Sequence, residues 1–159
     1  MILVADSGSS KTDWRLSDKT GKILQFRTSG INPLFHSKTE ISDLIKSEFI
    51  GQDNDLKSGE DLNIFFYGAG CSGEEKSGRV SEALRDLFPR AKIEVNHDLL
   101  GAARSLCGGK PGIASILGTG SNSCFYDGKN IIDNLPSLGF ILGDEGSGAH
   151  IGKKLLAHY

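Results

Sequence analysis

The sequence has no long apolar run, no cysteine cluster and almost no excess of charge of either sign. No apolar stretch approaches the ~18 residues that a transmembrane helix needs, so we predict no membrane span. The net charge is −2 over 159 residues, which gives no indication of a nucleic-acid partner or a membrane surface. This length suits one medium domain or two small ones.

Cysteine is scarce and scattered. The three cysteines are Cys71, Cys107 and Cys124, and neither a CxxC pair nor a Cys/His cluster occurs at metal-ligand spacing. We therefore expect reduced thiols. A strand already begins at Ile2, which leaves no room for a signal peptide, so we expect a cytoplasmic protein.

The sequence does contain a glycine-rich turn between two short strands near its start. A strand over 2–5 ends at Asp6, and the turn SGSS at 7–10 leads through the basic and hydroxyl pair at 11–12 into a second strand. Small side chains at such a turn let backbone N–H groups surround an anion. A carboxylate beside a phosphate cradle suits hydrated Mg²⁺, which binds through one or two carboxylates. A plain hairpin turn is the alternative.

The same arrangement returns later in the chain. An apolar strand over 113–117 is followed by the turn GTGS at 118–121 and by another strand over 123–126. Two such turns at the starts of two similar units indicate a duplicated nucleotide-binding fold, with the phosphates held between the halves. For this turn too, a plain hairpin is the alternative.

Between the two turns, the pattern predicts a mixed sheet with helices packed on it. The expected elements of the first unit are a three-stranded antiparallel meander up to 26, a helix with a capping box at 37–40 and a stop at Gly51, an exposed loop over 52–61, a central strand over 62–67, a helix that Pro89 closes, a strand over 93–95, and a short helix over 99–106.

We predict two domains, an N-terminal one over 1–110 and the beginning of a similar one over 111–159. The second unit repeats the meander, with a hairpin signal at 127–128, and then its first helix. The later strands that would complete its sheet are missing. We therefore expect a truncated piece of a longer protein, with an uncovered apolar face on the second sheet, weak ATP binding by this piece alone and a tendency to associate.

Four motifs, in order, resemble those of the actin/hexokinase/Hsp70-type ATPase superfamily, and more closely those of the N-acetylglucosamine kinase branch of the BadF/BadG/BcrA/BcrD ATPase-like family. They are the first turn over 6–12, the segment Asn-His-Asp at 96–98 with the four residues after it, the second turn over 117–122 and the segment Gly-Asp-Glu-Gly-Ser at 143–147. The resemblance implies an α/β, ribonuclease H-like (actin-like ATPase) fold. It also implies ATP, Mg²⁺ and a small-molecule sugar substrate, and it leaves a homodimer open.

The resemblance further implies roles for individual residues. Asp98 is the expected general base, which takes a proton from a sugar hydroxyl during phosphoryl transfer; the alternative is that it only caps the helix that follows. Asp6 is expected to hold Mg²⁺ through water. The residues expected to bind the ATP phosphates are Gly8, Ser9, Ser10, Lys11, Thr12, Gly118, Thr119, Gly120 and Ser121. The residues expected to contact the sugar are Asn32, Asn122, Gly139 and Asp144.

Three other residues receive structural roles. We expect His97 to be a hydrogen-bonded structural residue beside Asp98, and Trp14 to lie in the core. Cys71 has no histidine–acid pair placed to activate it, so we do not expect a nucleophile there.

The leading functional interpretation is a kinase that transfers the γ-phosphoryl group of ATP to a hydroxyl of an amino sugar such as N-acetylglucosamine. One alternative is an ATPase that activates a 2-hydroxyacyl-CoA dehydratase through an iron–sulfur cluster. Such a cluster needs thiolate ligands, and the three cysteines lack the expected placement near the loops. A second alternative is a non-catalytic sugar or nucleotide sensor, and Asp98 argues against it.

Overall fold

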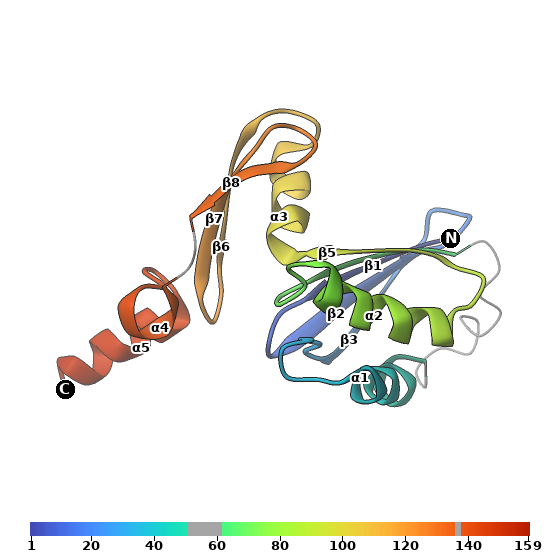
Figure 1. The fold of residues 1–159 in the computed structure, drawn as a ribbon, viewed down its shortest axis with the longest axis horizontal. Helices are drawn as coiled ribbons and strands as arrows, with labels where there is room; N and C mark the ends of the chain where they lie inside the picture. The colour runs from blue at the N-terminus through green and yellow to red at the C-terminus, as the bar shows by residue number, and fades with distance from the viewer. Residues whose placement is uncertain (51–61, 136–137) are drawn as a thin grey trace. The chain divides into compact units, whose positions relative to one another are not determined.

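The chain forms two compact units in the computed structural model, which describes residues 1–50, 62–135 and 138–159. The units are Met1–Asp98 and Leu99–Tyr159, and Figure 1 shows the elements of each. The boundary between the units thus falls at the start of the helix Asp98–Cys107, whereas the boundary predicted from the sequence lies after residue 110, beyond the end of that helix. The predicted stop at Gly51 and the predicted loop over 52–61 lie outside the described residues.

The first unit is built on a five-stranded mixed sheet with the strand order β3-β2-β1-β4-β5. Its strands are β1 Ile2–Ser7, β2 Lys11–Ser17, β3 Ile23–Ser29, β4 Asn63–Gly68 and β5 Lys92–His97. β1, β2 and β3 form an antiparallel meander, and β4 and β5 run parallel to β1. The predicted mixed sheet is therefore confirmed. Because β1 has a neighbour on each side, the turn after it starts from a fixed position.

Helices cover one face of this sheet (Figure 1). They are α1 Lys38–Leu44, the π-helical turn η1 Ile45–Phe49 and α2 Glu74–Leu87. The predicted capping box is confirmed, because the Ser37 hydroxyl accepts the Glu40 N–H and the Glu40 carboxylate accepts the Ser37 N–H. The π-helical turn was not predicted, since Ile45 and Phe49 keep the i, i+4 spacing that an ordinary α-helix uses.

The core of the first unit is centred on Trp14, which is fully buried as predicted. Its ring stacks on Phe49, with the ring centroids 4.5 Å apart, and meets Phe66 edge-on at 6.0 Å. The indole N–H donates to the Thr28 hydroxyl at 3.0 Å, so the buried polar group is satisfied. This cluster packs η1 against the strands β2 and β4.

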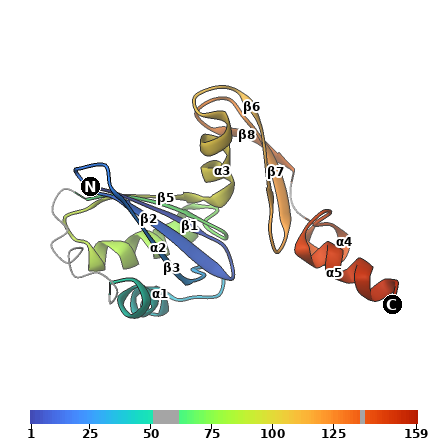
Figure 2. The same cartoon turned by 180° about the vertical axis from the view of Figure 1, so that it is seen from behind.

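The second unit repeats the meander, as predicted, in a sheet with the order β6-β7-β8. Its elements are α3 Asp98–Cys107, β6 Gly112–Leu117, β7 Ser121–Tyr126, β8 Ile131–Leu135, α4 Gly139–Leu142 and α5 Gly148–Ala157. Leu99 and Ala103 of α3 pack with Ala114, Cys124 and Tyr126 on one face of the sheet, and Figure 2 shows α3 alongside these strands. The short helix α4 was not predicted.

The other face of the second sheet carries exposed apolar side chains. Ile113, Leu117 and Phe125 are 75%, 68% and 46% exposed, and the register pairs Ile113 with Phe125. The predicted uncovered apolar face is therefore confirmed. Among the helices that the structure describes, none combines the length and the apolar character that crossing a bilayer would require.

Candidate active site

The first glycine turn joins β1 to β2 and closes on itself. The Gly8 N–H donates to the Lys11 carbonyl at 2.9 Å. Within the described part of the chain, the N–H groups of Ser9 and Ser10 have no hydrogen-bond partner. Consecutive unpaired N–H groups in a turn can form a concave site for an anion, and the phosphate role of this turn stays a prediction.

Two buried hydroxyls lie beneath this turn. The Ser7 and Thr12 oxygens are 2.7 Å apart, and the Ile31 N–H donates to Ser7 Oγ at 2.9 Å while Thr12 Oγ1 donates to the Ser29 carbonyl at 3.0 Å. Thr12 was predicted to contact the phosphates, yet its hydroxyl is engaged in fixing the turn to the end of β3. Lys11 forms an ion pair with Asp13 at 2.9 Å, so its phosphate role stays a prediction.

Gly30 leaves room for the turn. A Cβ at this position would lie 2.5 Å from the Gly8 carbonyl oxygen and from backbone atoms of Ser9. We predict that Gly30→Ala weakens binding of Mg·ATP to the intact protein by about tenfold, because the turn must move away from the added methyl group. Isothermal titration would measure this change.

Gly78→Ala on α2 is the matched control, since a Cβ there meets nothing within 4 Å. It is expected to bind Mg·ATP as the wild type does. Equal affinity of Gly30→Ala and wild type would contradict the role given to the turn.

Asp6 and Asp98 lie on the same side of the first sheet, at the carboxyl ends of the parallel strands β1 and β5. Asp6 on β1 is level with Tyr67 on β4, which is level with Asn96 on β5, two residues before Asp98. The pKa of Asp6 is raised above its ordinary value, first by desolvation and then by the negative charges of Asp98 and Asp13. The Asp6 side chain still reaches solvent, so a hydrated cation has access to it.

These carboxylates fit Mg²⁺ better than a metal enclosed by protein ligands. The described residues contain no cluster of three or more His, Cys, Asp or Glu side chains that could hold a metal ion. Mg²⁺ needs no such cluster, because it keeps several waters and binds through one or two carboxylates. A cation beside Asp6 would offset the negative charges that raise its pKa.

Asp98 is held by its neighbour. It is the first residue of α3, and His97 Nδ1 lies 3.0 Å from Asp98 Oδ1. Both side chains keep some exposure, 27% for His97 and 22% for Asp98. His97 thus contacts Asp98 as the structural residue that was predicted, and it orients the Asp98 carboxylate. Asp98 lies one position inside the helix rather than at the predicted cap, and it remains accessible to a substrate.

Cys71 is buried in the first unit. Burial, together with the charge of Asp98, raises the pKa of its thiol to about 12. The thiol therefore stays protonated near neutral pH, which agrees with the prediction that it is not a nucleophile.

Asn32, predicted to contact the sugar, is 4% exposed and lies next to the first turn. Its Nδ2 donates to Ser9 Oγ at 3.4 Å, and its Oδ1 accepts the Leu34 N–H at 3.0 Å. Gly70 has a positive φ of 78°, and a Cβ there would collide with Asn32 Oδ1. Asn32 therefore acts as a turn residue and also joins its loop to the first glycine turn.

The second glycine turn joins β6 to β7 and resembles the first. The Gly118 N–H donates to the Gly120 carbonyl at 2.9 Å, and the Gly118 carbonyl accepts the Gly148 N–H of α5 at 2.9 Å. Across the residues that the structure describes, the N–H groups of Thr119 and Gly120 have no hydrogen-bond partner. Each unit thus presents one turn with two unpaired backbone donors.

Asp144, also predicted to contact the sugar, lies against this second turn. Its Oδ1 accepts the Ser121 N–H at 3.1 Å, and both of its carboxylate oxygens lie 3.1 Å from where a Gly120 Cβ would be. Among the described residues, Asp144 is the one residue other than glycine that has a positive φ, at 61°. Such a backbone conformation often marks functional sites. Sequence reasoning missed both the contact and the conformation.

The other two predicted sugar contacts lie elsewhere in the second unit. The Asn122 Oδ1 accepts the N–H of the next residue, Ser123, at 2.9 Å. Gly139 begins α4 with a φ of 72°. Their sugar roles stay predictions.

The fold is shared with actin-like ATPases. MreB5 of Spiroplasma citri, solved with ADP, matches 84% of this chain and 50% of its own at 9% identity and a TM-score of 0.57. A protein of Chromobacterium violaceum, provisionally named N-acetylglucosamine kinase, matches 96% of this chain and 54% of its own at 21% identity and a TM-score of 0.69. At these identities the likeness establishes the fold, which is that of an actin-like ATPase.

Within this class, the chain resembles a protein of Porphyromonas gingivalis that is provisionally named N-acetylglucosamine kinase. The two are 49% identical with a TM-score of 0.91, over 99% of this chain and 55% of the other. The resemblance to the N-acetylglucosamine kinase branch, predicted from the sequence, is thus confirmed. The chain spans about half the length of these solved proteins. No family model and no curated protein matches the sequence.

Proposed function

We propose that the intact protein is an ATP-dependent kinase that phosphorylates an amino sugar such as N-acetylglucosamine. One observation carries this proposal: the strand register brings Asp6 and Asp98 to the carboxyl ends of β1 and β5, where the first glycine turn also starts. The 49% identity to a protein provisionally named N-acetylglucosamine kinase supports the same reaction.

In this reaction Asp98 acts as the general base. Its carboxylate accepts the proton of a sugar hydroxyl, the hydroxyl oxygen forms a bond to the γ-phosphorus of ATP, and the bond between that phosphorus and the β–γ bridging oxygen breaks to release ADP. His97 keeps the Asp98 carboxylate in one orientation through the 3.0 Å contact.

The two turns bind the phosphates through backbone N–H groups. Ser9 and Ser10 supply them in the first unit, and Thr119 and Gly120 supply them in the second. Mg²⁺, held through water by Asp6, supplies charge neutralisation to the phosphates when it is bound. The side chains of Asn32, Asn122 and Asp144 and the backbone at Gly139 supply the hydrogen bonds that select the sugar.

The test is ADP release from Mg·ATP by the intact protein, measured against a panel of hexoses and amino sugars. We expect one amino sugar to stimulate ADP release strongly over the rate without sugar. Glucose and galactose serve as controls that lack the N-acetyl group. Slow ATP hydrolysis that no sugar stimulates would reject the kinase.

A further inference from the structure

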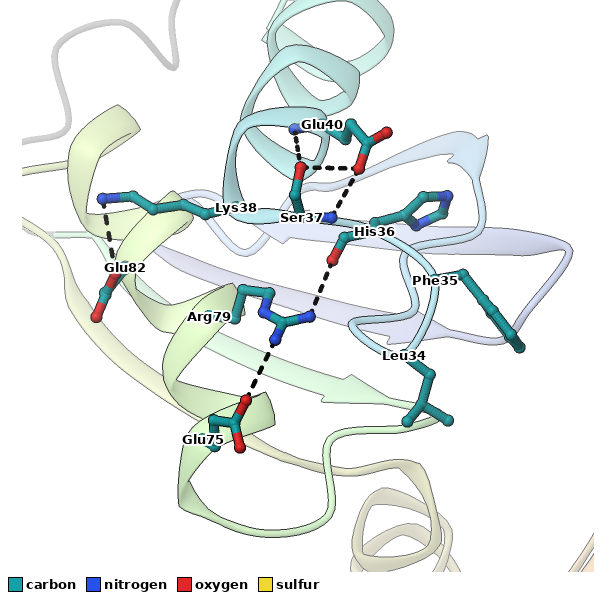
Figure 3. Close-up of a pocket in the computed structure, with 9 residues that line it drawn as sticks. All are labelled: Leu34, Phe35, His36, Ser37, Lys38, Glu40, Glu75, Arg79 and Glu82. Atoms are coloured by element: carbon teal, nitrogen blue, oxygen red, sulfur yellow. Dashed lines mark hydrogen bonds and ion pairs between the residues drawn. The ribbon is translucent and has the colours of Figure 1, made fainter.

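A groove of about 670 Å³ lies on the first unit, where the loop over residues 33–37 meets α1 and α2. Figure 3 shows the side chains that line it, with Arg79 of α2 at the centre. The groove does not present an open helix end to an anion, because Ser37 and Glu40 already cap α1. The Arg79 side chain extends across the groove from α2 to the loop.

The Arg79 guanidinium joins α2 to the backbone of this loop. Nη1 donates to the Pro33 carbonyl at 2.6 Å and to the His36 carbonyl at 3.5 Å. Nη2 pairs with Glu75 Oε1 at 3.4 Å, one turn earlier on the same helix. Figure 3 shows the contacts with His36 and Glu75. The planar fork of an arginine suits such simultaneous contacts, and a lysine lacks it.

The loop that Arg79 holds begins at Asn32. The Asn32 carbonyl accepts the N–H groups of Phe35 and His36 at 3.0 Å each, and the Asn32 side chain accepts the Leu34 N–H. In these bonds the loop donates through its N–H groups, whereas its Pro33 and His36 carbonyls accept hydrogen bonds from Arg79. The loop is thus hydrogen-bonded both to Asn32 and to α2.

The helix that carries Arg79 is itself fixed by the core. Val80, Ala83 and Leu84 of α2 are fully buried, so the base of the Arg79 side chain has a defined position. On the other side, Asn32 Nδ2 donates to Ser9 Oγ of the first turn at 3.4 Å. A continuous set of contacts therefore runs from the core through α2 and the loop to the first glycine turn.

We propose that Arg79 is a positioning residue for sugar binding, which holds the loop over residues 32–37 so that Asn32 stays in place beside the first turn. This inference rests on the proposed function, in which Asn32 contacts the sugar. In this proposal Arg79 acts through the loop backbone, which it bonds at the Pro33 and His36 carbonyls.

The kinetic test compares Arg79→Met with wild type in the intact protein. We expect the KM for the sugar to rise about tenfold, while kcat and the KM for ATP stay within twofold, because the loop contributes to binding the sugar rather than to the chemical step. Arg79→Lys is expected to recover part of the loss, since an ammonium group can still donate to one carbonyl. Arg85→Met, on the exposed face of the same helix, is the matched control and should match the wild type.

A second measurement does not depend on activity. In hydrogen exchange, the Phe35 and His36 amides should exchange faster in Arg79→Met than in wild type or Arg85→Met, because the loop has lost its tie to α2. An unchanged exchange rate at these amides would overturn the proposal, and so would an unchanged KM for the sugar. If wild type shows no sugar-dependent ADP release, the proposed function fails, and hydrogen exchange still decides whether Arg79 holds the loop.

Discussion

Replacing Asp98 by asparagine is expected to lower kcat for sugar phosphorylation by about 10²–10⁴-fold, the usual contribution of a general base. The amide has nearly the same size as the carboxylate and can still contact His97, but it cannot accept a proton from the sugar hydroxyl. The KM values for sugar and for ATP should change little, since both glycine turns stay intact. Steady-state ADP release at saturating sugar would measure the effect.

The control is Asp43→Asn on the exposed face of α1, which removes the same charge away from the sheet edge. It is expected to keep the wild-type kcat. A kcat of Asp98→Asn within a factor of a few of wild type would show that another group accepts the proton. If only the KM values rose, Asp98 would be a binding residue instead.

The largest effect on stability is expected at Trp14. Trp14→Ala removes the stacked contact with Phe49 and the edge contact with Phe66, and it leaves the Thr28 hydroxyl without the indole donor. Large-to-small changes of buried aromatic residues cost about 3–5 kcal/mol. Urea unfolding followed by circular dichroism would measure the loss, because the substitution removes the chain's single tryptophan.

Two variants calibrate this measurement. Phe35→Ala changes an aromatic side chain that is 75% exposed, and we expect a change within about 0.5 kcal/mol. Trp14→Phe should fall between the two, since a smaller ring keeps part of the packing. An unfolding midpoint of Trp14→Ala equal to that of Phe35→Ala would show that the stacked cluster is not central to the fold.

The order of the strands and of the longer helices could be predicted because each of these has a local signal, which α4 and η1 lack. The meander follows from alternating apolar residues around turns, and the start of α1 follows from the Ser37–Glu40 capping box, which needs only a four-residue spacing. Both glycine turns were recognised because glycine and small hydroxyl residues directly follow apolar strands. These features depend on neighbours in the sequence.

Features that depend on distant contacts could not be predicted. Nothing around Thr12 reveals that its hydroxyl bonds the Ser29 carbonyl, because that contact forms only when β2 pairs with β3. Asp144 has a positive φ, a conformation that glycine normally adopts. Arg79 is one of several charged residues on α2, and only the folded loop identifies it as the residue that bonds Pro33.

The two turns share a property that bears on how such a site changes during evolution. Each offers backbone N–H groups, at Ser9 and Ser10 in one and at Thr119 and Gly120 in the other, and every residue except proline supplies that donor. Side chains in the turns can therefore change while these backbone donors are retained. A neighbouring position such as Gly30 cannot gain a side chain without moving the turn, so if the proposed phosphate role holds, selection on it would act partly on residues that do not contact the ligand.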